Sequence, residues 1–233
     1  FVAYHKPDVN DPDDAGGAVT ALDRPSGITS SADGAHLYVA SRFGNAVLVF
    51  NRTNVAGSGF GRLSYASVLR NGLGGVQGLG GAFDLALSPD GAQLYVVGES
   101  SNAIAVFDRA ANGTLTWRTQ IRKNDPGVHG LGGPQSVEVS PDGTQVYVAG
   151  FADDSFTVFR RATAPATGVA IGDLAVQQTV FDDEGQVTAM NGPVAIATSG
   201  DNRHIYVAAS VDNAVVVFTR DSNAQELFAD GFE

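Results

Sequence analysis

Residues 88–109 read SPDGAQLYVVGESSNAIAVFDR, and three other parts of the chain follow the same pattern. Each part contains a tyrosine followed by valine within an apolar run, and the four tyrosines are spaced 52–59 residues apart: Tyr38, Tyr95, Tyr147 and Tyr206. Self-similarity at a period of roughly 50 residues is typical of stacked units that cannot bury their apolar surfaces alone. The sequence therefore predicts one quasi-periodic body.

Each repeat alternates short apolar runs with turn-forming residues. In the second repeat, FDLALS (83–88), QLYVVG (93–98), AIAVFD (103–108) and LTWRTQIR (115–122) are separated by Gly, Pro, Asn and Asp. The Pro-Asp-Gly turn at 89–91 suits a tight reversal, because proline presets φ, aspartate bonds local backbone and glycine accepts positive φ. Helical periodicity is missing, so the pattern predicts an all-β protein, a β-propeller of four-stranded antiparallel blades.

Alignment of the repeats sets the expected boundaries. We expect blades over about residues 22–71, 79–124, 131–183 and 190–221, an N-terminal strand over 1–6 and a C-terminal tail over 222–233. The aligned strands place four aliphatic residues in the core, Ile28, Leu85, Val137 and Ile196, and four phenylalanines between blades, Phe50, Phe107, Phe159 and Phe218. Two arrangements stay open. The N-terminal strand closes a four-bladed ring, or the four blades belong to a larger ring, for example a seven-bladed one.

Composition excludes several classes of partner. The formal net charge is −11, and the two lysines are Lys6 and Lys123, so the surface would repel nucleic acid and anionic membranes. The chain has no cysteine, which excludes disulfides and thiolate chemistry. No apolar run reaches the ~18 residues that a membrane-spanning helix needs. We therefore predict neither a nucleic-acid nor a membrane partner.

The second and third repeats resemble a known family. The stretch at 88–109, together with GLGGPQSVEVSPDG (130–143), is similar to the lactonase-type, YVTN-like β-propeller repeats of bacteria. The resemblance implies relatives of the 6-phosphogluconolactonase type, usually with seven blades, and many exported proteins. The ending ELFADGFE (226–233) resembles the C-terminal tails of exported proteobacterial proteins. Together these resemblances imply a periplasmic or extracellular bacterial protein.

Residues that recur in every repeat are expected to serve the architecture. The turn aspartates are Asp33, Asp90, Asp142 and Asp201, and the arginines that end each third strand are Arg52, Arg109, Arg161 and Arg220. We expect the aspartates to form turns and the arginines to make ion pairs or backbone contacts between blades.

Residues that break the repeat are better candidates for a ligand site. Asp84 and Glu138 are acids within otherwise apolar strands, Arg42 and Glu99 follow the second strands of their repeats, and His129 lies in a connection between blades. A buried carboxylate must be paired, hydrated or neutralised. Asp84 and Glu138 therefore predict either a structural water network along the propeller axis or a site for a polar ligand.

Searches for catalytic, metal and cofactor motifs find none. The acidic segment 8–17 partly matches a calcium loop, but Ala15 and Leu22 stand where ligands are needed. We therefore predict no metal and no cofactor.

Three functions remain as hypotheses. The main one is an exported, non-enzymatic binding or scaffolding module that holds a small molecule or protein at its loop-bearing rim. The alternative is a lactonase-like hydrolase acting on a sugar lactone, with Arg42, Glu99, Glu138 and His129 around the substrate, a carboxylate or histidine activating water and arginine holding an anionic group. The third is self-association through exposed edge strands at the termini.

Overall fold

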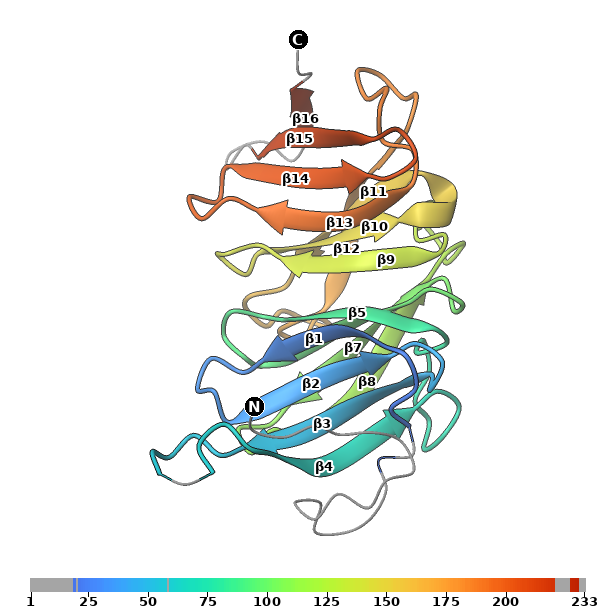
Figure 1. The fold of residues 1–233 in the computed structure, drawn as a ribbon. Coiled ribbons are helices and arrows are strands. Elements are labelled where there is room, and N and C mark those ends of the chain that lie inside the picture. The colour runs from blue at the N-terminus through green and yellow to red at the C-terminus, as the bar shows by residue number, and fades with distance from the viewer. Residues whose placement is uncertain (1–18, 20, 58, 221–226, 231–233) are drawn as a thin grey trace.

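The computed structural model describes residues 19, 21–57, 59–220 and 227–230, and Figure 1 shows their arrangement. These residues form four antiparallel sheets of four strands each. The first sheet consists of β1 (Pro25–Ser30), β2 (His36–Ser41), β3 (Ala46–Arg52) and β4 (Leu63–Arg70), and the second of β5 (Ala82–Leu87), β6 (Gln93–Gly98), β7 (Ala103–Arg109) and β8 (Leu115–Arg122). The third consists of β9 (Pro134–Val139), β10 (Gln145–Gly150), β11 (Ser155–Arg161) and β12 (Leu174–Phe181), and the fourth of β13 (Pro193–Thr198), β14 (His204–Ala209), β15 (Ala214–Arg220) and β16 (Leu227–Asp230).

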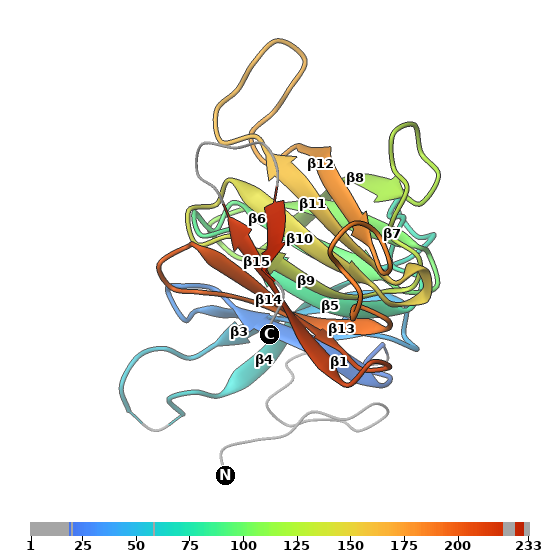
Figure 2. The same cartoon turned by 90° about the horizontal axis from the view of Figure 1, so that it is seen from above.

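The sheets follow one another in chain order, as blades of a propeller do. The first strand of each sheet contacts the first strand of the next, from β1 to β5, to β9 and to β13. In the view from above, β4, β8 and β12 lie farther out than these first strands (Figure 2). The prediction of an all-β propeller with four four-stranded blades is confirmed.

The fourth sheet obtains its last strand from the C-terminal end of the chain. The strand β16 pairs with β15, from Val217 opposite Asp230 to Arg220 opposite Leu227. The sequence places these residues in a tail, whereas the structure makes them the fourth strand of a blade. The N-terminal strand expected over residues 1–6 and the acidic segment 8–17 lie outside the described residues.

The turns between first and second strands are built as the sequence predicts. Asp90 Oδ1 accepts hydrogen bonds from Ser88 Oγ at 2.5 Å and from the backbone N–H of Ala92 at 3.0 Å. Gly91 has a φ of 68°, which a residue with a Cβ atom rarely adopts. Asp142 repeats these contacts in the third sheet. The turn aspartates are therefore structural.

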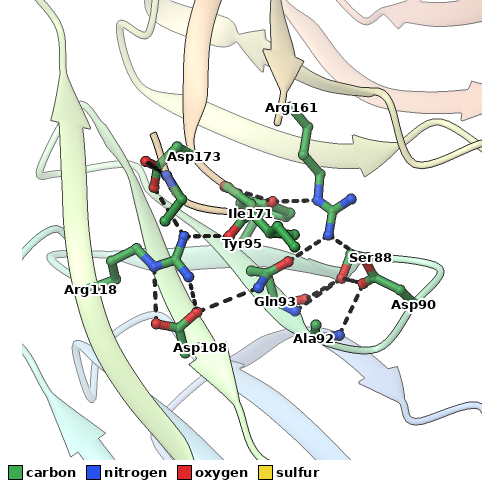
Figure 3. Close-up of polar contacts among 12 residues, drawn as sticks. Ser88, Asp90, Ala92, Gln93, Tyr95, Asp108, Arg118, Arg161, Ile171 and Asp173 are labelled. Atoms are coloured by element: carbon green, nitrogen blue, oxygen red, sulfur yellow. Dashed lines mark hydrogen bonds and ion pairs between the residues drawn. The ribbon is translucent and has the colours of Figure 1, made fainter. Parts of the chain in front are cut away.

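The recurring arginines join adjacent sheets. Arg161 Nε donates to the hydroxyl of Tyr95 at 2.9 Å, and its Nη2 lies 2.7 Å from Asp90 Oδ2. Figure 3 shows this arginine reaching Gln93 and Asp90 of the second sheet. Its Nη1 donates to the carbonyl oxygen of Gly143 in its own sheet at 3.0 Å. Arg109 and Arg220 make the corresponding ion pairs, so the expected contacts between blades are confirmed for these three arginines. The described contacts of Arg52 lie within the first sheet, where its Nη1 donates to the carbonyl oxygen of Gly34.

The apolar core lies between the sheets. The four phenylalanines expected there, Phe50, Phe107, Phe159 and Phe218, are at most 2% exposed. The prediction of a place between blades is confirmed for the last three, which pack against the preceding sheet. It is wrong for Phe50, which packs within the first sheet and against Val19 and Ala21. Leu85 and Val137 are buried because each packs against the preceding sheet. The core prediction for Ile28 is wrong, because this residue of the first sheet is 65% exposed. No described sheet precedes it to cover its side chain.

The described part of the chain has no helix that is long and apolar enough to cross a bilayer.

Candidate functional site

A cavity of about 340 Å³ lies where the first strands of all four sheets converge. Its lining comes from β1, β5, β9 and β13: Ile28, Thr29, Asp84, Leu85, Ala86, Leu87, Ser136, Val137, Glu138, Val139 and Ile196. In Figure 1 these strands lie next to one another along the middle of the molecule. We call this space the axial cavity. Both acids that interrupt the apolar strands, Asp84 and Glu138, line it.

Asp84 is held in place by hydrogen bonds from two sheets. Its Oδ1 accepts from the backbone N–H of Leu85 at 2.8 Å, and its Oδ2 accepts from the N–H of Val137 at 3.1 Å and from Ser136 Oγ at 3.2 Å. Ser136 Oγ in turn accepts from the N–H of Ile196 at 3.2 Å. One chain of contacts thus links the second, third and fourth sheets. Burial raises the pKa of Asp84, and the three hydrogen bonds only partly oppose this.

Glu138 is less tightly held. Its described hydrogen bond comes from Thr198 Oγ1 at 3.5 Å, the limit of such a contact. Burial raises the pKa of Glu138, and the nearby charge of Asp84 raises it further. Two carboxyl groups that share one cavity oppose each other's ionisation, so the cavity favours retention of a proton.

A second polar cluster combines residues that directly follow β2 and β6 with residues of β5 and β9. Arg42 Nη2 lies 2.5 Å from Glu99 Oε2, and Arg42 Nε donates to the same oxygen at 2.8 Å. Gln135 Nε2 donates to Glu99 Oε1 at 3.1 Å, and the Arg42 guanidinium lies 5.0 Å from the centroid of the Phe83 ring. Phe83 and Gln135 directly precede Asp84 and Ser136 in β5 and β9. We call these four residues the rim cluster.

The predicted site residues therefore separate into three places. Asp84 and Glu138 line the axial cavity, while Arg42 and Glu99 pair with each other in the rim cluster. His129 is exposed on the connection between β8 and β9 and does not line the axial cavity. The sequence did not single out Phe83, Gln135 and Thr198, because these residue types are common in strands. Only contacts between sheets bring them to the candidate site.

A metal centre is not evident in the described ranges, where no group of three or more histidine and acidic side chains could hold an ion. The acidic segment 8–17 lies outside these ranges.

Four-stranded blades around an axial cavity define the class of this protein as a β-propeller repeat protein. Residues 76–169, the second blade and the first three strands of the third, match the family described as lactonase with a seven-bladed β-propeller. The resemblance to lactonase-like propellers is thereby confirmed.

Several known proteins are similar over most of this chain. Antigen Lp49 of Leptospira interrogans is 26% identical over 203 residues, which are 84% of this chain and 39% of that protein. The structure of the periplasmic gluconolactonase of Pseudomonas aeruginosa gives a TM-score of 0.69 at 23% identity, covering 89% of this chain and 53% of that one. A putative 6-phosphogluconolactonase of Bacteroides fragilis gives 0.68 at 18% identity, covering 88% and 53%. The chain thus spans about half the length of these solved structures.

Proposed function

We propose that this chain forms part of a lactonase-like hydrolase that binds a sugar lactone at the axial cavity. The observation that carries the proposal is the pairing of Asp84 with Glu138 in one cavity, where burial raises the pKa of both. The match of residues 76–169 to the lactonase family supports the substrate class.

The two carboxyl groups suit different roles in opening a lactone ring. Water must attack the acyl carbon while a base accepts its proton, and the same base then returns this proton to the ring oxygen as the acyl–oxygen bond breaks. Glu138 is the better base, because its single described contact at 3.5 Å leaves lone pairs free for a water molecule. A raised pKa strengthens a carboxylate as a base. Asp84, fixed by three donors, raises the pKa of Glu138 and orients hydroxyl groups of the sugar.

The rim cluster supports the same assignment. The charges of Arg42 and Glu99 offset each other at 2.5 Å, so this cluster presents hydrogen-bonding groups with little net charge. Phe83 and Gln135 add an aromatic ring and an amide, a combination that suits the apolar faces and hydroxyl groups of a sugar.

We also infer that the protein is exported. The resemblance to a periplasmic gluconolactonase supports this inference, and so does the resemblance to an antigen of Leptospira.

Binding without hydrolysis is the second candidate. It is favoured by the separation of the four residues expected around the substrate, since Arg42 is engaged by Glu99 and His129 does not line the axial cavity. A propeller of this kind would hold a sugar or a protein segment at its rim and release it unchanged.

Hydrolysis of glucono-δ-lactone above the spontaneous rate tests the proposal. We expect saturable turnover that falls by roughly 100-fold or more in Glu138→Gln, the usual effect of removing a general base. Glu184→Gln is the matched control, because Glu184 is exposed and does not line the axial cavity. Unchanged turnover in Glu138→Gln rejects this site. Binding of the lactone with no turnover favours the second candidate.

A further inference from the structure

We propose that His36 makes the joint between the first and second sheets sensitive to acid, so that this joint loosens as the pH falls below about 6. His36 begins β2 and is 8% exposed. Its ring lies under the turn 110–114, which joins β7 to β8, because a Cβ atom added to Gly113 would lie 2.1 Å from His36 Cδ2. The inference is independent of the proposed lactone site.

A contact with Arg109 requires the His36 ring to be neutral. Arg109 Nη2 lies 3.1 Å from His36 Nδ1. A guanidinium group has only donors and stays charged, so Nδ1 must be the acceptor, and the proton of the neutral ring is on Nε2. A second proton on Nδ1 would leave two positively charged donors facing each other. Acid therefore converts this hydrogen bond into a repulsion.

The next two joints use glutamine at the corresponding position. Gln93 begins β6 and Gln145 begins β10, as His36 begins β2. Gln93 Oε1 accepts from Arg161 Nη2 at 2.5 Å, a contact that Figure 3 shows, and Gln145 Oε1 accepts from Arg220 Nε at 2.5 Å. A glutamine amide does not titrate, so both joints keep their acceptor in acid. The first joint instead depends on an acceptor that protonation removes.

The carboxylate that would offset the second proton is more distant at the first joint. Asp33 Oδ2 lies 3.9 Å from Arg109 Nη2, whereas the corresponding ion pairs of Arg161 and Arg220 measure 2.7 Å and 2.8 Å. The Asp33 side chain is also 55% exposed, so water and salt screen its charge. Arg109 therefore relies on His36 more than the other two arginines rely on glutamine.

The other groups around the ring do not supply a compensating negative charge. Tyr38 stays neutral, because burial raises the pKa of its hydroxyl. The turn 110–114 contains no charged residue. Arg52 and Asp108 lie on the far faces of the first and second sheets, since side chains alternate along β3 and β7. The response to acid is therefore decided by Arg109 and Asp33.

A displaced Arg109 would disturb the turn that covers His36. Arg109 Nε donates to the hydroxyl of Tyr38 at 2.6 Å, and this hydroxyl donates to the carbonyl oxygen of Gly113 at 3.1 Å. One chain of contacts thus connects the arginine with the turn 110–114. We expect acid to open this turn locally, while the joints that contain glutamine stay closed.

Hydrogen exchange measured by mass spectrometry tests the inference. Exchange is followed at pH 7.5 and pH 5.0 in peptides that cover residues 110–115, and each rate is corrected for the intrinsic effect of pH. We expect protection in the wild type to fall roughly fivefold or more at pH 5.0, as for a segment that opens locally. His36→Gln should keep its protection at both pH values, because glutamine supplies a permanent acceptor. The segment 170–174 provides an internal reference, since Gly172 lies against Gln93 as Gly113 lies against His36.

Two further variants make the result specific. Gln93→His should transfer the response, so that segment 170–174 also loses protection at pH 5.0. His204→Gln is the matched control, because His204 begins β14 and has no arginine among its described contacts, and this variant should respond as the wild type does.

Equal protection of residues 110–115 at both pH values in the wild type overturns the proposal. A loss in His36→Gln as large as in the wild type does the same. If His36→Gln does not fold, Gln93→His decides, and unchanged protection of segment 170–174 in that variant rejects the proposal.

Discussion

Arg161 Nε donates a 2.9 Å hydrogen bond to the hydroxyl of Tyr95, although the two residues stand 66 positions apart in the chain. The same hydroxyl donates to the carbonyl oxygen of Gly172 at 3.0 Å. Burial raises the pKa of Tyr95 to about 12, with the charge of Arg161 acting in the opposite direction. The phenol is therefore neutral, fully engaged and placed between two blades.

Removing this hydroxyl should weaken the joint between the second and third sheets. We expect Tyr95→Phe to lower the free energy of unfolding by about 1–3 kcal/mol, because Arg161 Nε and the Gly172 carbonyl lose a buried partner. Tyr206→Phe is the matched control at the equivalent exposed position, with an expected change within about 0.5 kcal/mol. Chemical denaturation of both variants measures the difference. Equal losses would contradict the role given to Tyr95.

The phenylalanines between the blades should account for a larger share of stability. Phe107 is fully buried, so Phe107→Ala should cost about 3–5 kcal/mol through lost transfer free energy and the cavity left behind. Phe60, which is 50% exposed, provides a control whose replacement by alanine should cost about 1 kcal/mol or less. A loss below about 1 kcal/mol for Phe107→Ala in urea denaturation would contradict the burial of this side chain, because the lost transfer free energy remains even when the cavity collapses.

Asp142 should make stability depend on pH in the acid range. Burial alone would raise the pKa of its carboxyl, but hydrogen bonds from Arg220, Ser140 and Thr144 outweigh this and hold the pKa well below its usual range. A lowered pKa in the folded state contributes stability above the unfolded value, near 4, and this contribution is lost as pH falls.

The variant Asp142→Asn removes that contribution while keeping a residue suited to the turn. We expect a loss of about 1 kcal/mol at pH 7, limited by solvent screening of this partly exposed carboxylate, and a flatter decline below pH ~4. Lactone binding should not change. Thermal melts across pH 2–7 measure the stability, and curves that run parallel for variant and wild type would refute the assignment.

Glu138 in the axial cavity should make stability depend on pH in the opposite direction. The raised pKa of Glu138 in the folded state means that its contribution is present below the unfolded pKa, near 4, and is lost as pH rises through the folded value. Glu138→Gln should therefore lose less stability than the wild type when the pH is raised from about 4 to 7. Thermal melts at these two pH values provide the measurement, and the prediction fails if the variant declines as steeply as the wild type.

Strand positions, tight turns and blade cores could be predicted from the sequence, because they depend on the order of residues within a short segment. Phe107 faces a neighbouring blade since side chains alternate along a strand, and Asp90 forms its turn with residues only two positions away. Asp84 and Glu138 stood out for a similar reason, as acids at apolar positions of a repeated strand. Their types and positions were therefore visible in the repeat itself.

Apart from the recurring arginines, the polar contacts between sheets were not predictable from the repeat. The bond from Ser136 to Asp84, the pairing of Arg42 with Glu99 and the exclusion of His129 from the axial cavity depend on how neighbouring blades are offset. The exposure of Ile28 and the pairing of β16 with β15 depend on which segments occupy the ends of the stack. Strand periodicity comes from the backbone and so appears in any short window of sequence. Burial and pairing are set by the segment that packs alongside, and that segment can lie 50 or more residues away.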